Sequence, residues 1–413
     1  MTPEMKGFML VSVVKLALVF TFVMILVAYS TLLERWIAAW IQDRIGPNRA
    51  GPKGLLQPIA DGLKNLLKEE VIPSGSNKVF FVIAPAISLM AALLIPLTIP
   101  WAAPMPLDFD LTLPLLGRFV HRGATPATVA VLPIGFLFVL AISSVGVYGI
   151  ALGGWASNNK YSLLGGIRAT AQMVSYEVAM GLSLIPVLLL VGNVSFPQIV
   201  QAQQQGPLGW LVLPLALSAF IFLVSGFAES NRVPFDLPEA ESELVAGYHT
   251  EYSAMKFSAF MIAEFASMVT ISMMFVTLFL GGWDIPFTHW DEAGGMRQFW
   301  ATAVVFFVKT LFFLFLFMWV RWTLPRFRYD QLMALGWKVF IPMGLAYVMF
   351  IAVGLWVVEG PLGVTSPAAR SGLLFLLNLP VLVFVFRILD RGRLIRGSST
   401  HRPPAAPRPA RAA

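Results

Sequence analysis

Residues 8–33 read FMLVSVVKLALVFTFVMILVAYSTLL, an apolar run interrupted by one charged residue, Lys15. An α-helix needs about 20 apolar residues to cross the hydrocarbon core of a bilayer. The run is too long for the apolar part of a cleavable signal peptide, and no small-residue cleavage site follows it. We therefore predict that it forms the first membrane span.

Eight further apolar runs of roughly 20 residues follow along the chain. The predicted spans are residues 8–33, 79–100, 127–152, 171–192, 210–228, 256–281, 299–322, 339–358 and 371–388. The 413 residues are 57% hydrophobic and 12% charged, whereas soluble domains carry about 25% charge. The sequence therefore predicts an all-α, polytopic transmembrane helical bundle of about nine spans, folded as a single domain over residues 1–390.

Lysine and arginine residues predict the orientation of the chain. With the N-terminus outside, the cytoplasmic segments and the C-terminal tail carry 22 of these residues, and the outer segments carry 5. Such an excess on the cytoplasmic side is typical of membrane proteins. The basic, proline-rich residues 391–413 then form a disordered cytoplasmic tail near anionic lipid headgroups.

Three of the predicted cytoplasmic loops are long. The first, residues 34–78, contains the turn RIGPNRAGPKG at 44–54, whose spacing does not match a phosphate-binding loop. Apolar residues at helical spacing follow and predict an amphipathic helix, either at the membrane interface or packed as a cap on the bundle. The second loop spans residues 153–170 and the third begins at residue 229. Because these loops share one side, we expect a soluble partner to bind there.

The third loop is dense in acids. Residues 229–251 hold six carboxylates, at Glu229, Asp236, Glu239, Glu241, Glu243 and Glu251. A solvated acidic loop has this composition, but carboxylates between two spans usually have a function. Glu177 and Glu264 lie within predicted spans, where charge is costly. Structural ion pairs are one explanation for them, with Lys15 and Lys309 as candidate partners.

The acidic loop also has features of a helix start. Asp236 is a candidate N-cap, and Pro238 suits the first helical turn. Glu239 and Glu243 are four residues apart, so on a helix they share a face and repel each other. A row of carboxylates with unequal, coupled pKa values can hold and pass protons near neutral pH. We therefore favour a proton path, with Arg232 as a candidate counter-ion.

The chain has no cysteine, and its four histidines are scattered. Cysteine-ligated iron–sulfur clusters and cysteine zinc sites are therefore excluded. We expect no flavin, iron–sulfur cluster or metal on this chain, and nothing in the sequence indicates binding to nucleic acid.

Several motifs resemble those of one family. They are ER at 34–35, QDRIGPNRAGP at 42–52, LQPIAD at 56–61, GWASNNKYSLLGGIRA at 154–169, AESNRVPFDLPEAESE at 228–243 and PRFRYDQLM at 325–333. Together they resemble the quinone-site membrane subunit of respiratory complex I, the bacterial NADH:quinone oxidoreductase and its mitochondrial counterpart. Ser230 and Ala240 depart mildly from the family pattern, and the ninth span and the tail lie beyond the family's eight-span core.

The resemblance implies a multi-pass subunit of the bacterial inner membrane, with quinone as its substrate. Its partners would be lipid, small neighbouring membrane subunits, and hydrophilic subunits that carry the terminal iron–sulfur cluster. The residues that the resemblance assigns to the quinone chamber and its entrance are Arg35, Asp61, Phe260, Met261 and Arg326. Those that it assigns to a proton path are Glu34, Glu177, Glu229, Asp236, Glu239, Glu241, Glu243 and Glu264.

Two alternatives stay open on the sequence. The matching subunit of a membrane-bound hydrogenase or a ferredoxin-linked complex would share the fold without using quinone. A self-contained ion transporter would have inverted repeats and broken helices at the middle of the membrane. The sequence shows no internal repeat, and its long cytoplasmic loops favour a subunit with partners.

Overall fold

A computed structural model describes residues 2–113, 117–204, 209–236, 244–285, 295–364 and 366–390. The helices are α1 Pro3–Ile41, α2 Gln57–Leu67, α3 Lys78–Leu94, α4 Gly135–Ala156, α5 Lys160–Val191, α6 Phe196–Gln203, α7 Ala216–Glu229, α9 Ala254–Phe279, α10 Met296–Thr323, α11 Tyr329–Ala334, α12 Ile341–Glu359 and α13 Pro367–Asp390. Short 3-10 turns lie at Pro52–Gly54, Ile95–Thr98 and Gly247–His249, and a π-helical turn, Leu335–Phe340, joins α11 to α12. The strands β1 Met105–Pro106, β2 Phe109–Leu113, β3 Gly117–His121 and β4 Ala124–Thr125 form two antiparallel pairs, β1 with β4 and β2 with β3.

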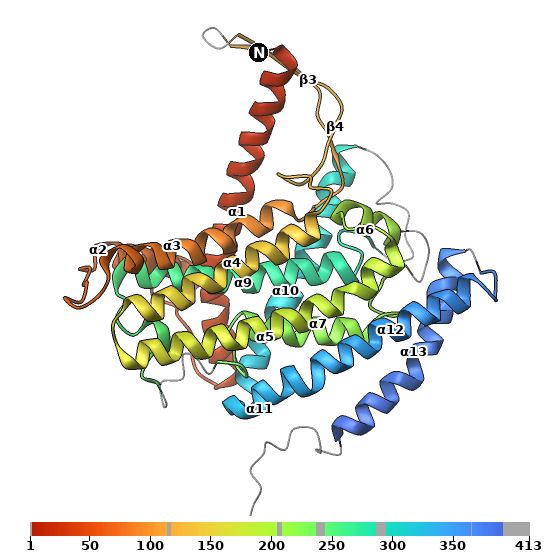
Figure 1. The fold of residues 1–413 in the computed structure, drawn as a ribbon. Helices are drawn as coiled ribbons and strands as arrows, with labels where there is room; N and C mark the ends of the chain where they lie inside the picture. Colours follow the sequence, from red (N-terminus) through yellow and green to blue (C-terminus); the bar gives the residue numbers. More distant parts are fainter. Residues whose placement is uncertain are drawn as a thin grey trace, which may run out of the picture.

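The long helices lie side by side in a bundle (Figure 1). Helix α9 is its centre, because it packs against α1, α3, α7 and α10, and most of its length is buried. Helix α1 crosses the bundle and projects beyond it, and β3 packs along the projecting part. Gly7 of α1 permits this approach, since a Cβ there would lie 2.1 Å from the carbonyl oxygen of Val120.

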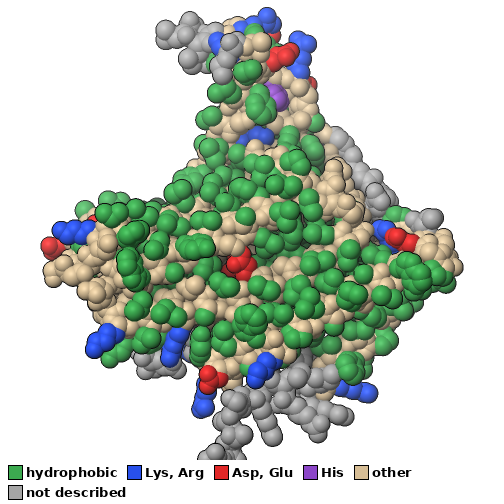
Figure 2. Space-filling view, in the orientation of Figure 1, with side chains coloured by type: hydrophobic (Ala, Val, Ile, Leu, Met, Phe, Trp, Pro, Cys, Tyr) green, Lys and Arg blue, Asp and Glu red, His purple; other side chains and the backbone are tan. Residues whose placement is uncertain are grey.

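In the described part of the chain, eight helices are long and apolar enough to cross a membrane. Hydrophobic side chains cover most of the flank of the bundle, and charged side chains lie mainly toward its ends, apart from an acidic side chain in the middle of this face (Figure 2). The predicted all-α polytopic bundle is therefore confirmed. The orientation with the N-terminus outside stays a prediction.

The fifth predicted span differs from the others. Residues 211–215 form turns, and the helix α7 that follows is only 14 residues long. At 1.5 Å per residue, such a helix covers about 21 Å, less than the hydrocarbon core of a bilayer. The nine predicted spans thus correspond to eight long helices and one short one among the described residues.

The three long loops that were predicted on one side do lie together. The amide of Asn77 donates to the carbonyl oxygen of Ala156 at 3.1 Å, which joins the first loop to the second. Asn159 Nδ2 donates to Glu251 Oε1 at 2.6 Å, which joins the second loop to the third, and the amide of Val71 donates to Ser253 Oγ at 3.1 Å, which joins the first loop to the third. The first loop is therefore bound to the second and to the third at the same end of the bundle. Helix α2 also lies at that end, at the left of Figure 1.

Candidate functional site

Arg232 lies at the centre of a buried group of charges. Its Nη1 is 3.2 Å from Glu34 Oε2 on α1, and its Nε is 2.7 Å from Glu264 Oε1 on α9. The side chains of Arg232 and Glu264 are 6% and 7% exposed. Its guanidinium also lies over the ring of Phe265, 4.1 Å from the ring centre. One arginine thus holds together two carboxylates from helices far apart in the sequence.

The turn after α7 places Arg232 there. The helix ends at Glu229, and Asn231 takes a left-handed conformation with φ of 49°. The buried Nε2 of Gln172 on α5 then donates to the carbonyl oxygens of Ala228 and Phe235, both at 2.8 Å. The side chain of Gln172 therefore holds both sides of this turn. Sequence reasoning did not find Gln172, although a glutamine within a predicted span is a usable signal.

Glu34 has a second arginine partner, since Arg321 on α10 forms a short ion pair with its other oxygen. Sequence reasoning counted Arg321 only as a cytoplasmic charge. Its place in the last turn of a predicted span, facing the end of the first span, was the signal available. Two arginines and two glutamates therefore form one connected, mostly buried group.

A second ion pair lies at the same end of the bundle. Arg326 Nη2 is 2.9 Å from Asp236 Oδ2. Burial raises the pKa of Asp236, and the neighbouring Arg326, Arg321 and Arg232 oppose that rise. Asp236 is therefore a carboxylate whose charge depends on the arginines around it. The helix predicted to start here, and Glu239, Glu241 and Glu243 with it, lie outside the described residues.

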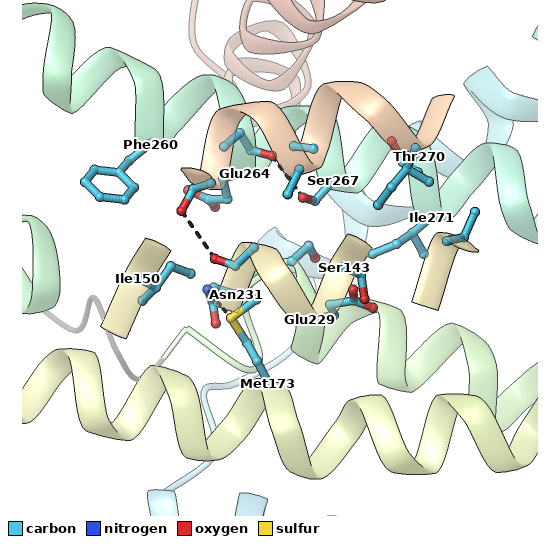
Figure 3. Close-up of a pocket in the computed structure, with 18 of the residues that line it drawn as sticks. Ser143, Ile150, Met173, Glu229, Asn231, Phe260, Glu264, Ser267, Thr270 and Ile271 are labelled. Atoms are coloured by element: carbon cyan, nitrogen blue, oxygen red, sulfur yellow. Dashed lines mark hydrogen bonds between the residues drawn. The ribbon is translucent and has the colours of Figure 1, made fainter. Parts of the chain in front are cut away.

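A cavity of about 60 Å³ lies among α3, α4, α5, α7 and α9. Glu264 and Glu229 both line it, together with Ser143, Ser267 and Thr270. Figure 3 shows Glu264 and Ser267 facing this space from α9, and Ser143 and Glu229 facing it from α4 and α7. A buried water needs about 10–15 Å³ and two to four polar partners. The cavity therefore suits a small group of water molecules between two carboxylates.

Glu177 lies next to Glu229. Ser143 Oγ is 3.5 Å from Glu177 Oε1, and Ser144 makes a short hydrogen bond to the same oxygen. Ser143 also lines the cavity that Glu229 faces. The buried Oε2 of Glu229 makes no hydrogen bond with the described residues. Ser143 thus lies between a half-buried carboxylate and the cavity, a link that sequence reasoning did not find.

Of the five residues assigned to the quinone chamber and its entrance, Arg326 lies in the loop between α10 and α11, and the other four fall on α1, α2 and α9. Arg35 Nη1 is 2.8 Å from Asp61 Oδ2, which joins the end of α1 to α2. Helix α2 packs against both α1 and α9, and it leaves Ile59, Leu66 and other apolar side chains exposed. Helices α1, α2 and α9 therefore contact one another, and the exposed apolar side chains of α2 lie beside this contact.

Phe260 and Met261 lie on α9, near these contacts. Phe260 is 2% exposed and lines the cavity, whereas Met261 is half-buried. Phe260 packs edge-to-face against Tyr248 and Tyr252, with ring centres 5.2 and 5.0 Å away. Of this pair, therefore, only Phe260 is a wall of the cavity.

His249 lies beside the same aromatic rings, 5.3 Å from the ring centre of Phe257. Burial lowers its pKa from 6.5 to about 4. It is therefore neutral at physiological pH. No group of three histidine, aspartate or glutamate side chains that could hold a metal ion lies within the described ranges.

The lysines within spans bind backbone atoms. Lys15 Nζ donates to the carbonyl oxygens of Pro126 and Thr128, at 3.2 and 3.0 Å, so the partners predicted for it as carboxylates are carbonyls. Lys309 Nζ donates to the carbonyl oxygens of Leu280 and Asp284, at 2.8 and 2.5 Å, just after the end of α9. Both lysines therefore donate hydrogen bonds to backbone carbonyl oxygens that lie outside the hydrogen-bonding pattern of a helix.

Comparisons with known proteins show the family of this chain. The family model described as NADH dehydrogenase matches residues 14–352. The chain belongs to this family. It is 47% identical over 347 residues to an NADH-quinone oxidoreductase H subunit of Cytophaga hutchinsonii, covering 83% of this chain and 96% of that relative. It is 48% identical over 336 residues to an NADH-quinone oxidoreductase H subunit of Geobacter metallireducens, covering 81% and 93% of the two chains.

A third relative is the NADH-quinone oxidoreductase H subunit of Flavobacterium johnsoniae, 47% identical over 346 residues, which cover 83% of this chain and 95% of the relative. Family membership and the apolar helices together make this chain a multi-pass protein of the bacterial inner membrane and a subunit of an enzyme complex. The family assignment made from the sequence motifs is confirmed.

Proposed function

We propose that this subunit forms the quinone chamber and its entrance in a proton-translocating NADH:quinone oxidoreductase. We further propose that it links quinone reduction to proton movement through its acidic residues. The observation that carries the proposal is the cavity between Glu264 and Glu229, because it joins a carboxylate held by Arg232 to one that is not ion-paired in the described residues.

The contacts of α1, α2 and α9 support the position of the entrance. The exposed apolar side of α2 suits the isoprenoid tail of a quinone arriving from the lipid. Arg35 and Asp61 would fix α2 against α1, and Phe260 and Met261 would border the passage on α9. The cavity of about 60 Å³ suits water and not a quinone ring. The quinone headgroup would therefore lie nearer the hydrophilic subunits, which carry the terminal iron–sulfur cluster.

The ion pairs support a route for the signal. Arg326 and Asp236 would meet a change of charge at the quinone first, because they lie at the loop end of the bundle and are partly exposed. Arg232 binds Glu34 and Glu264 at once, so a change in its position or surroundings alters both carboxylates. Water in the cavity would then pass a proton from Glu264 toward Glu229.

Glu177 is the next carboxylate along this route. Ser143 links the cavity to Glu177, and hydroxyl groups can donate and accept in a proton chain. We assign five carboxylates to the path: Asp236 first, then Glu34 and Glu264 on Arg232, then Glu229 and Glu177. Glu239, Glu241 and Glu243 keep their predicted place in the path.

The replacement Glu229→Gln tests the proposal. It keeps the shape of the side chain and replaces the titratable carboxyl group with an amide that does not titrate near neutral pH. We expect normal assembly of the complex, with NADH:quinone reductase activity and proton pumping both reduced at least about tenfold, as for loss of a proton-transfer group. Pumping is measured in inverted membrane vesicles, and the amount of complex is measured by immunoblot.

Glu4→Gln is the matched control, since Glu4 is an exposed carboxylate in the first turn of α1. It should leave reductase activity and pumping at the level of the unmodified protein. Full pumping in assembled Glu229→Gln complex would contradict the proposed path.

A further inference from the structure

The start of α7 is irregular, although it lies in the apolar part of the molecule. Residues 211–215 form turns, and the helix begins at Ala216 with no side-chain hydrogen bond at its N-cap. Because α7 covers only about 21 Å, this irregular backbone falls within the depth of the hydrocarbon core. Non-helical backbone at that depth is stable only where protein groups satisfy its polar atoms.

Helix α13 supplies such a group. Asn378 Nδ2 donates to the carbonyl oxygen of Pro214 at 2.7 Å, and also to the carbonyl oxygen of Leu374 in its own helix at 2.9 Å. Asn378 is fully buried, with 0% exposure, and lies near the middle of α13. A carboxamide is costly in a helix that faces lipid, so its burial against the start of α7 is a specific contact.

The first turn of α13 makes a second polar contact with the bundle. Arg370 Nη2 donates to the carbonyl oxygen of Leu190 at 3.1 Å, in the last turn of α5. Arg370 Nη1 also forms an ion pair with Glu359 at the end of α12, at 2.8 Å. Leu374 packs between these polar contacts and is fully buried. Helix α13 is therefore fixed against α5, α7 and α12, and does not merely lie beside them in the lipid.

This helix lies outside the part of the chain that matches the family model, which ends at residue 352. The function proposed above gives it no role. Yet its contact with Pro214 bears on the site, because α7 is a single short helix that runs from this contact to Glu229. A displacement at the first turn of a rigid helix is carried to its last turn.

We propose that α13, through Asn378, holds the start of α7 and so positions Glu229 in the cavity wall. Asn378 is a positioning residue in this account. The effect on activity rests on the function proposed above, whereas the effect on the backbone of residues 209–219 does not. The effect on the backbone and the effect on activity can therefore be tested, and contradicted, separately.

Amide hydrogen exchange in the purified complex tests the contact. In Asn378→Leu, which is similar in size and lacks the donor, exchange in residues 209–219 should rise about fivefold, as expected for the loss of one hydrogen bond. Exchange in α9 should stay unchanged. NADH:quinone reductase activity should fall severalfold, while NADH oxidation by a water-soluble acceptor stays constant.

Two further variants separate positioning from a general loss of structure. Asn378→Gln keeps a carboxamide donor and should restore most of the reductase activity. Leu376→Ala changes a side chain of α13 that is 60% exposed, and it should change neither measurement. If Asn378→Leu does not assemble, the smaller change Asn378→Ala is measured in the same way.

Unchanged exchange in residues 209–219 would overturn the contact between α13 and α7. Raised exchange with full reductase activity would overturn the positioning of Glu229. If Glu229→Gln proves fully active but exchange rises in Asn378→Leu, the proposed path fails and the holding of α7 by α13 stands.

Discussion

The cations at the two ends of the bundle, buried Arg232 and half-buried Lys309 and Lys15, bind different acceptors. Near the long loops, Arg232 binds the carboxylates of Glu34 and Glu264. At the opposite end, where α9 finishes and α4 begins, Lys309 and Lys15 bind backbone carbonyl oxygens. Both arrangements give hydrogen-bond partners to a charged side chain that is at least partly removed from bulk water. Only the carboxylate partners can change their protonation.

A backbone carbonyl has no proton to gain at physiological pH, so the bonds of Lys309 and Lys15 are fixed anchors for helix ends and loops. A carboxylate can be neutralised, and each neutralisation changes what Arg232 binds. The carboxylate end is therefore suited to switching, and the carbonyl end is suited to support. Substitutions at the carboxylate end should alter activity, and substitutions at the carbonyl end should alter the free energy of unfolding.

The largest effect is expected for Arg232→Met. Removing one partner of a buried ion pair costs about 3–5 kcal/mol, because the other charge stays buried. Here two carboxylates lose their partner at once, so we expect little assembled complex and no measurable quinone reductase activity. Blue native gels and activity in isolated membranes check this, and normal amounts of active complex would mean that Arg232 is dispensable.

A smaller effect is expected for Glu264→Gln. The amide keeps the shape of the side chain and leaves Arg232 bound to Glu34, so the complex should assemble. Quinone reductase activity should fall about tenfold or more, as for removal of a proton-transfer group. Steady-state rates in purified complex measure it, and a rate within twofold of the unmodified enzyme would remove Glu264 from the path.

Lys309→Met should affect stability alone. Three carbonyl oxygens lose a donor, and we expect a loss of about 1–3 kcal/mol in the free energy of unfolding. Reductase activity per assembled complex should stay the same at low temperature. Thermal melting of the purified complex measures the loss. A lowered reductase rate with an unchanged melting temperature would contradict this assignment, because Lys309 would then act in turnover and not in support.

The smallest effect concerns His249. Its pKa is lowered from 6.5 to about 4 by burial, so unfolding releases a side chain that takes up a proton below pH 6.5. The free energy of unfolding should therefore fall as the pH decreases below about 6.5 and toward 4, by less than about 1 kcal/mol between pH 7 and pH 6. Melting temperatures of the unmodified complex and of His249→Asn should diverge in their pH dependence. Parallel curves would show that His249 does not contribute.

Most of the fold follows from the apolar runs, but the ends of the helices do not. The predicted span 127–152 begins before Gly135, where α4 starts, because Pro133 disfavours helical backbone in the residue before it. In contrast, α5 starts at Lys160, well before the predicted residue 171, because Asn159 caps it with a bond to the amide of Tyr161 at 2.9 Å. Apolar composition detects neither effect.

The charged residues of the site were also predictable, but not their pairing. The sequence identified Glu177, Glu229, Asp236 and Glu264 by their types and places, and the family resemblance added Glu34. The residues that connect them come from other helices, so only tertiary packing brings them together. Arg321, Gln172 and Ser143 belong to this class, and each looks like an ordinary residue of a span or a loop.

The most direct test of the account is to fill the cavity while both carboxylates remain. Ser267→Leu places an apolar side chain in the space between Glu264 and Glu229, and Ser267→Ala removes the hydroxyl while leaving the space open. The measurement is proton pumping in inverted membrane vesicles, normalised to the assembled complex. We predict that pumping falls to background in Ser267→Leu and stays substantial in Ser267→Ala; normal pumping in assembled Ser267→Leu would contradict a water-filled proton path through this cavity.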